Sequence, residues 1–213
     1  TLYPGTYTVT ETQPAAYLDG KDTAGTASPG STAGTVTSND AISNIVLAEG
    51  GVSTDNNFGE RQGVSVSGYV YKDTGNDGVW DGPSAGISGV TLTLTGNDNL
   101  GNPVSVTATT DANGAYSFIG LQPSDATGYT VVETQPSGYL DGIDTAGSTP
   151  GSVAGNDVIS HIVLPNLGES SVNNNFGEVA ARINGFIFHD VDNDGLKEPG
   201  DSGIGSGGTN IIT

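Results

Sequence analysis

The sequence predicts an all-β protein built from two-sheet sandwiches in tandem. Short segments rich in Val, Ile, Thr, Tyr and Phe alternate with turns rich in Gly, Asn and Asp. No segment combines a 3.6-residue apolar period with helix caps. The chain also repeats itself, with a period that suits one small domain. Seven or so short strands within one such period are typical of two packed antiparallel sheets.

The internal repeat divides the chain into one whole unit and two partial ones. GYVYKDTGNDG, which begins at Gly68, matches GFIFHDVDNDG, which begins at Gly185, 117 positions later. YTVTETQPAAYLDGKDTAG near the start matches YTVVETQPSGYLDGIDTAG in the middle, and NNFGE occurs twice. We therefore expect residues 1–62 to be the C-terminal portion of a repeat, residues 63–179 a complete repeat, and residues 180–213 the N-terminal portion of a following repeat.

In the complete unit the expected strands follow one another at short intervals. VSVSGYVYKD, VTLTLTG and VSVTATTD alternate apolar side chains with polar or small ones, as half-buried strands do. AYSFIGLQP, GYTVVETQP, DVISHIVLP and SVNNNFGE come next. The turn sequences DANG, SDATG and PSGYLDG separate neighbouring strands.

The charge balance restricts the possible partners. The 24 acidic and 5 basic residues give a formal charge of −19. Such a surface repels nucleic acid and anionic membranes, so we expect neither as a partner. Divalent cations would relieve the repulsion among the carboxylates. The alternative is that the acidity only keeps the surface soluble.

Two further absences bear on stability and location. The chain contains no cysteine, so its stability must come from the core, a metal or another crosslink. No apolar run is long enough to span a bilayer and no signal peptide is present, so we expect no membrane insertion of this segment. We expect the chain to be a segment of a longer mature protein.

The segment DVDNDGLKEPGD, residues 190–201, has the ligand spacing of a Ca²⁺-binding loop. Oxygen side chains occupy loop positions 1, 3, 5, 9 and 12, a glycine occupies position 6, and position 7 offers its backbone carbonyl. The alternative is an acidic turn in solvent. The expected ligands are Asp190, Asp192, Asp194, Leu196 through its carbonyl, Glu198 and Asp201.

The central unit has a poorer copy of this loop. Gly75 and Ser84 replace carboxylates at two ligand positions, so this loop should bind Ca²⁺ more weakly or take ligands from a neighbouring segment. The expected ligands are Asp73, Asp77, Val79 through its carbonyl, and Asp81.

A second acidic motif occurs in both the first and the central unit. YLDGKD carries Asp19 and Asp22, and YLDGID carries Asp141 and Asp144. An Asn–Asp pair follows in each unit before the next strand, at residues 39–40 and 156–157. If the flanking strands pair, these groups can meet and form another Ca²⁺ site. The alternative is ordinary Asx-turn chemistry.

The order of motifs resembles a known family. GYVYKDTGNDGVWDGPSAGISGVTLTL is followed by TTDANGAYSFIGLQP and then by GYTVVETQPSGYLDG. This order is similar to that of the B-type domains of serine–aspartate-repeat bacterial surface proteins, which are relatives of the B domain of collagen adhesins. The resemblance covers the whole central unit and both partial ones. It implies an immunoglobulin-like β-sandwich that is exposed on or secreted from a bacterial cell, binds Ca²⁺ and forms part of a stalk.

The same resemblance raises the possibility of a covalent crosslink. In collagen-adhesin B-type domains, a glutamate promotes an isopeptide bond between a lysine on the first strand and an asparagine on the last. Here Lys72 and Glu133 fit the first two roles, and Asn174 or Asn175 fits the third. Two features disfavour the bond: the third unit has His189 in place of the lysine, and Lys72 directly precedes an expected metal ligand.

We therefore expect a non-enzymatic, calcium-binding structural repeat of an extracellular bacterial surface fibre or adhesin stalk. Its expected partners are neighbouring repeats or copies of itself, with a host or matrix protein or a glycan as a further possibility. One alternative is a filament subunit that polymerises head to tail by complementation of its partial terminal units. Another is a ligand-binding adhesin module, which would need an exposed aromatic patch around Trp80. Neither His161 nor His189 lies in a triad or zinc motif.

Overall fold

The computed structural model describes residues 2–149, 151–180 and 187–203. These residues form β-strands and one short 3₁₀ turn, η1 (Pro83–Ala85). The N-terminal part carries β1 (Gly5–Thr10), β2 (Tyr17–Asp19), β3 (Thr26–Ala27), β4 (Thr35–Ser38), β5 (Ala41–Leu47), β6 (Ser53–Thr54) and β7 (Glu60–Gln62). The central part carries β8 (Val64–Lys72), β9 (Thr91–Asn97), β10 (Pro103–Thr109), β11 (Ala115–Leu121), β12 (Tyr129–Glu133), β13 (Leu140–Asp141), β14 (Ser152–Gly155), β15 (Val158–Ile162), β16 (Ser170–Ser171) and β17 (Phe176–Val179).

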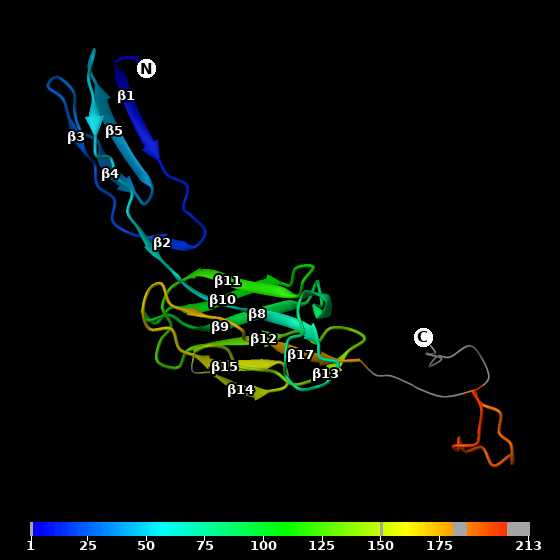
Figure 1. Ribbon diagram of the computed structural model, residues 1–213. Coiled ribbons are helices and arrows are strands. Elements are labelled where there is room, and N and C mark those ends of the chain that lie inside the picture. The colour runs from blue at the N-terminus through cyan, green and yellow to red at the C-terminus, as the bar shows by residue number, and fades with distance from the viewer. Residues whose placement is uncertain (1, 150, 181–186, 204–213) are drawn as a thin grey trace.

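The central strands form a two-sheet sandwich (Figure 1). One sheet has the order β10-β9-β12-β15-β14, and the other has the order β11-β8-β17-β13, with β16 beside β8. Most neighbours are antiparallel, but β16 and β17 both run parallel to β8. The predicted all-β, immunoglobulin-like sandwich is confirmed.

Alternation along the strands decides which side chains fill the space between the sheets. In β8, Val64, Val66 and Val70 are fully buried, and β9 contributes Leu92 and Leu94 in the same way. The opposite positions of β9 carry threonines that are more exposed. The remaining fully buried apolar residues of this core are Tyr129, Val131, Ile159, Ile162, Leu164 and Phe176.

The N-terminal part repeats the second half of the sandwich. Its sheets are β1-β5-β4, β2-β7 and β3-β6. The pairings of β1 with β5 and of β5 with β4 correspond to those of β12 with β15 and of β15 with β14. The end of β7 continues through Gly63 directly into β8, so the two parts form an elongated arrangement (Figure 1).

The last expected strand of the central unit is interrupted. SVNNNFGE forms β16 and β17 with a break between them, because Asn173 adopts a left-handed conformation with φ 61°. Asn174 and Asn175 fill the break and bond to backbone groups through their side chains. The short strands β13 and β14 were not expected from the sequence.

Only part of the third unit is described. Phe188 pairs with Gly203 in an isolated antiparallel bridge, which brings the two ends of the segment 188–203 together. The expected strand residues at 181–186 and the C-terminal residues 204–213 lie outside the described residues. Within the described part of the chain, no helix is long and apolar enough to cross a membrane.

The core assignment leads to a first prediction. Leu94→Ala should lower the free energy of unfolding by about 2–5 kcal/mol, because it removes a buried side chain and leaves a cavity. Leu100→Ala is the matched control, since Leu100 is 70% exposed, and it should change stability by no more than about 0.5 kcal/mol. Urea unfolding in one buffer measures both variants. Equal losses in the two variants would contradict the assignment.

Candidate cation-binding site

Five carboxylates converge at one end of the central sandwich, and we call them the central cluster. Glu133 ends β12 on the core side, because Tyr129, Val131 and Glu133 alternate inward. Glu178 follows Phe176 inward on β17 and is fully buried. The members of the central cluster are Glu133, Asp141, Asp144, Asp157 and Glu178.

Backbone contacts hold the three aspartates of the central cluster in place. Asp141 on β13 pairs with Glu178 on β17. The carboxylate of Asp144 accepts the backbone N–H of Gly177 at 3.2 Å and that of Asp157 at 3.1 Å. Asp157 lies in the tight turn between β14 and β15 with φ 59°, a left-handed conformation that aspartate tolerates better than most residues. These contacts fix the positions of three aspartates that come from different segments of the chain.

The carboxylate oxygens in this cluster lie close enough to share cations. One oxygen each from Glu133, Asp157 and Glu178 lie within 4.8 Å of one another. The same is true of Asp141, Asp144 and Asp157, so Asp157 belongs to both groups. Ca²⁺ takes six to eight oxygen ligands, and several carboxylates around one point are its usual protein ligands.

Five carboxylate oxygens of the central cluster are buried without hydrogen-bond partners. Both carboxylate oxygens of Glu133 and one each of Asp141, Asp157 and Glu178 are of this kind. Glu178 is fully buried and Glu133 is 4% exposed. A buried carboxylate without a partner is strongly unfavourable unless it is neutralised by a proton or a cation. This donor set therefore fits a bound cation.

Burial and mutual repulsion raise the pKa values of Glu133, Asp144, Asp157 and Glu178 in the central cluster. Burial, followed by the charge of Glu178, raises the pKa of Glu133 to about 9. Burial also raises the pKa of Glu178 to about 7, although a hydrogen bond from Gln135 opposes the shift. The pKa of Asp144 rises to about 7 through burial, against the lowering effect of the Gly177 N–H. Without a cation the cluster therefore retains protons near neutral pH.

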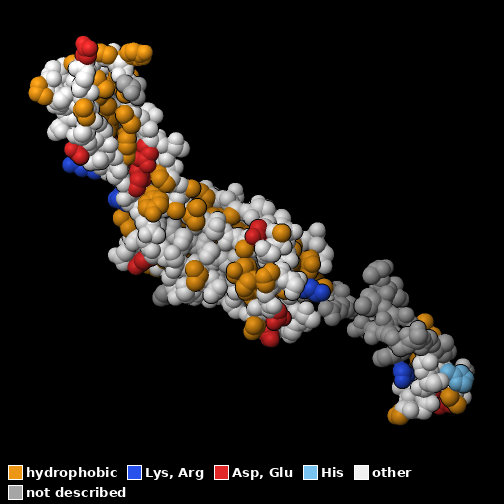
Figure 2. Space-filling view, turned by 45° about the horizontal axis from the view of Figure 1, so that its top comes forward, with side chains coloured by type: hydrophobic (Ala, Val, Ile, Leu, Met, Phe, Trp, Pro, Cys, Tyr) orange, Lys and Arg blue, Asp and Glu red, His pale blue; other side chains and the backbone are white. Residues whose placement is uncertain are grey.

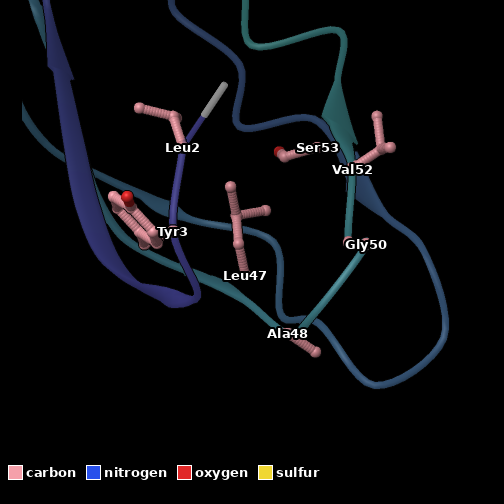
Figure 3. Close-up of a pocket in the computed structure, with 8 residues that line it drawn as sticks. Leu2, Tyr3, Leu47, Ala48, Gly50, Val52 and Ser53 are labelled. Atoms are coloured by element: carbon pink, nitrogen blue, oxygen red, sulfur yellow. The ribbon is translucent and has the colours of Figure 1, made fainter.

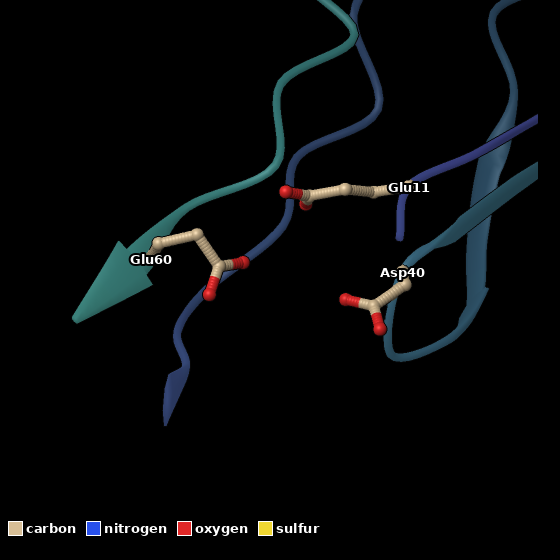
Figure 4. A group of neighbouring side chains, drawn as sticks. All are labelled: Glu11, Asp40 and Glu60. Atoms are coloured by element: carbon tan, nitrogen blue, oxygen red, sulfur yellow. The ribbon is translucent and has the colours of Figure 1, made fainter. Parts of the chain in front are cut away.

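The N-terminal part contains the same arrangement, which we call the N-terminal cluster. Figure 4 shows Glu11, Asp40 and Glu60 pointing toward one another. In Figure 2, acidic side chains gather where the N-terminal strands approach the central sandwich. Burial, followed by the charge of Glu60, raises the pKa of Glu11. The members are Glu11, Asp19, Asp22, Asp40 and Glu60.

The two clusters share equivalent backbone hydrogen bonds. Asp22 accepts the backbone N–H groups of Asp40 and Gly59, as Asp144 does in the central cluster. Among the described residues, nine of the twelve buried side-chain atoms without a hydrogen-bond partner belong to the two clusters. Such concentration of unpaired oxygens at two equivalent places points to one recurring site.

The loop of the third unit also brings three carboxylates together. Oxygens of Asp190, Asp192 and Asp194 lie within 4.8 Å of one another. Backbone N–H groups of Gly195 and Asp194 bond to Asp190, and these bonds lower its pKa. The carboxylates of Glu198 and Asp201 do not join this group, and Asp201 instead accepts the Glu198 N–H at 2.9 Å. The carbonyl of Leu196 stays a predicted ligand.

The central loop, residues 73–81, is less complete. Asp73 is 1% exposed and accepts the Gly78 N–H at 2.7 Å, while its other oxygen is buried without a partner. Asp77 accepts the Val79 N–H, and Asp81 is exposed. Among the described residues, this loop does not gather three carboxylates.

The central loop nevertheless lies beside the central cluster. Tyr71 has a buried hydroxyl without a hydrogen-bond partner. Burial raises its pKa, and the charges of Asp73, Asp77 and Asp144 add to the effect. The charges of the loop acids and of a cluster acid therefore act on the same hydroxyl group.

Comparison with known proteins identifies the family. A model of the SdrD B-like domain matches residues 64–176, which is more than half of the chain. The chain belongs to the SdrD B-like domain family. Its B-like repeat carries the central cluster, and the N-terminal cluster lies in the equivalent portion of the preceding repeat.

Relatives of this B-like chain come from staphylococci. It is 29% identical over 171 residues to serine-aspartate repeat-containing protein F of Staphylococcus epidermidis, a match that covers 78% of this chain and 10% of that protein. It is 42% identical over 105 residues to serine-aspartate repeat-containing protein I of Staphylococcus saprophyticus, covering 46% of this chain and 5% of that protein. The chain is also 26% identical over 160 residues to serine-aspartate repeat-containing protein D of Staphylococcus aureus (strain Newman). This match covers 75% of this chain and 12% of that protein. The chain thus spans about a tenth or less of these relatives' length.

Sequence reasoning found only part of the B-like repeat's clusters. The structure brings the predicted Asp141 and Asp144 to Asp157, and the predicted Asp19 and Asp22 to Asp40. It also adds a pair of glutamates to each cluster. The motif NNFGE, which ends each repeat with a glutamate, was the available signal for one member of each pair.

The residues considered for an isopeptide bond have other contacts. Glu133 lies among the acids of the central cluster. The amide of Asn174 donates to the Ser67 carbonyl at 3.1 Å and accepts the Gly147 N–H at 3.1 Å. Asn175 accepts the Tyr69 N–H through its side chain. These contacts give the crosslink no support, and it stays an untested prediction.

Other candidate sites in the described residues are less organised. Figure 3 shows a hollow of about 410 Å³ near the N-terminus, lined by Leu2, Tyr3, Leu47, Ala48, Gly50, Gly51, Val52 and Ser53. No charged side chain lines it. Trp80 stacks on Tyr69 with ring centroids 3.7 Å apart, so one of its faces is covered. The Nδ1 atom of His161 lies within hydrogen-bond distance of the hydroxyls of Ser152 and Ser160.

The raised pKa values predict how the metal-free protein responds to pH. Between about 4.5 and 9 the folded state binds more protons than the unfolded state at Glu133, and the same holds for Glu178 and Asp144 up to about 7. The free energy of unfolding should therefore fall as pH rises from 5 to 9, by about 1.4 kcal/mol per pH unit for each extra bound proton.

Urea unfolding of calcium-stripped protein at pH 5, 7 and 9 measures this slope. Glu133→Gln removes one of the titrating groups and should make the slope shallower. A stability of the unaltered protein that increases over the same range would show that the cluster is not buried as described.

Proposed function

We propose that this chain is a calcium-stiffened stalk segment of a bacterial cell-surface adhesin, located outside the cell and without catalytic activity. The observation that carries the proposal is the recurrence, in two consecutive repeats, of one acidic cluster that contains buried oxygens without hydrogen-bond partners. Membership of the SdrD B-like family and the names of the staphylococcal relatives support its place in a repeat-containing protein.

The donor set favours calcium over other cations. All ten cluster side chains offer carboxylate oxygens, which suit hard cations, and neither histidine nor cysteine belongs to either cluster. Mg²⁺ requires near-ideal octahedral geometry and retains several waters. The clusters are assembled from irregularly placed turns and strand ends, which suits the flexible coordination of Ca²⁺.

A bound cation would act as a clamp on the end of each repeat. In the central cluster it would join the ends of β12, β13 and β17 to the turn between β14 and β15. These segments lie on both sheets, so the ion would tie one sheet to the other. Without it, the carboxylates must bind protons or separate.

The proposal makes neighbouring repeats the first partners of this chain. Short connections favour a rod: only Arg61, Gln62 and Gly63 separate Glu60 from β8. An ion held by Glu60 would therefore act close to the start of the next repeat. Binding of a host or matrix protein or a glycan is a separate hypothesis, and the stacked Trp80 does not favour it.

Calcium should stabilise the chain through the clusters. At a free concentration of about 100 times Kd, each site adds about 2.7 kcal/mol, which raises Tm by roughly 5–10 °C for a chain of this size. The double variant Asp40→Asn/Asp157→Asn, which alters the aspartate shared by both groups of each cluster, should lose most of this rise. Differential scanning calorimetry with Ca²⁺, with Mg²⁺ and with a chelator measures the effect.

The control is Glu49→Gln, which removes an exposed acid outside both clusters and should respond to Ca²⁺ like the unaltered chain. In chelator, the double variant should be at least as stable as the unaltered chain, because it carries less repulsion. If Ca²⁺ still raised the Tm of the double variant as much as that of the unaltered chain, the calcium site would lie outside the clusters.

A further inference from the structure

The N-terminal part touches the central sandwich through a tight turn. Residues 14–17 form this turn, closed by the Tyr17 N–H, which donates to the Pro14 carbonyl at 3.0 Å. The Ala16 carbonyl accepts the N–H of Gly63, which immediately precedes β8, at 3.1 Å. The strand after the turn, β2, contacts β11 of the sandwich (Figure 1).

Two glycines allow backbone to meet backbone at this contact. Gly120 lies in β11 with φ 67°, where the pairing with β8 shifts register. A Cβ atom on Gly120 would lie 2.4 Å from the Ala15 carbonyl oxygen. A Cβ atom on Gly63 would lie 2.7 Å from the Cα of Gly120. No side chain fits at Gly120 while the turn is docked, whereas at Gly63 it is β11 itself that leaves no room for one.

The turn is attached at both ends to a glutamate of the N-terminal cluster. Before the turn, the Gln13 amide donates to the carboxylate of Glu60. After it, β2 pairs with β7, with Asp19 opposite Glu60. The Arg61 guanidinium adds two hydrogen bonds to the Asp19 carbonyl. The position of the turn therefore depends on the position of Glu60.

We propose that the turn of residues 14–17 and the Gly63–Gly120 surface form a joint that fixes the orientation of one repeat on the next, and that a cation in the N-terminal cluster holds this joint closed. The inference rests on the proposed calcium binding and adds the means by which it reaches the next repeat. Without a cation, repulsion among Glu11, Asp40 and Glu60 pushes β7 away from its neighbours and loosens the turn. With a cation, β2, β7 and the turn form one unit against β11.

The connection after the central repeat differs in sequence from the connection at this joint. Ala180 stands five residues before Gly185, where Gly63 stands five residues before Gly68. The chain from Glu178 to Gly185 is also one residue shorter than the chain from Glu60 to Gly68. The proposal therefore concerns the first junction alone.

Distances between spin labels on the two repeats test the joint. The chain has no native cysteine, so Ser38→Cys and Ser105→Cys, both exposed, place one label on each side of the junction. Double electron–electron resonance on the whole chain should give one narrow distance peak in Ca²⁺ and a broad distribution in chelator. Calorimetric titration with Ca²⁺ on the same protein reports whether the clusters bind the ion.

Gly120→Ala should broaden the distribution in Ca²⁺ without changing calcium binding, because the new Cβ collides with the turn and not with a cluster. Gly120→Asn serves as a second variant, since asparagine accepts a positive φ more readily and still carries the colliding Cβ. Gly155→Ala is the matched control, because a Cβ there meets nothing within 4 Å. It should keep the narrow peak.

The outcomes separate the joint from calcium binding itself. A narrow peak in both Gly120 variants, or a distribution insensitive to Ca²⁺ although calorimetry shows binding, overturns the joint and leaves the proposed function standing. Absence of calcium binding in the unaltered chain overturns both. Broadening in both Gly120 variants with normal calcium binding supports the joint.

Discussion

The mutual repulsion of buried carboxylates is the constraint on which the rest of this structure depends. Each cluster gathers five acids, and oxygens from three of them lie within 4.8 Å of one another. Two unit charges at that separation repel by roughly 3 kcal/mol at an effective dielectric constant of about 20. The strands that deliver these acids are the same strands that close the end of the sandwich, so the repulsion acts directly on the fold. The molecule can relieve it with protons, with cations or by opening.

The composition of the chain makes this constraint more important. A cysteine-free chain has no disulfide to close a loop, and several of the strands around the clusters are only two or three residues long. Strands such as β2, β3 and β13 contribute few ladder hydrogen bonds. A cation that binds only the folded arrangement would add its binding free energy to folding at these weak places. The hydrophobic core includes Val131 and Phe176, which lie two positions before Glu133 and Glu178, so the central cluster borders the core.

The sequence was a good guide to the strands and an incomplete guide to the site. Long alternating segments such as 91–97 and 103–109 were predictable because one face is buried and the other is not. The meeting of Asp141 and Asp144 with Asp157 was predictable because the motifs occur in both repeats, in the same order. The sequence suggested for Glu133 only a role in a disfavoured crosslink, although its place two residues after the buried Val131 puts it on the core side of the strand. The loop spacing drew attention to residues 73–81, yet spacing along one loop reports local geometry only. The cluster depends on strand pairings across the sandwich, which no local pattern specifies.

Two repeats with equivalent clusters need not have equivalent junctions. The clusters recur because the acids that form them lie within each repeat, on the strands and turns of one folding unit. A junction, by contrast, depends on residues from two units, and here it depends on a glycine before β8 and another in the middle of β11. Selection for the cluster alone therefore does not maintain the joint. In the proposed stalk, one or two glycines would therefore suffice to change the stiffness of a junction, while each repeat keeps its own acidic cluster.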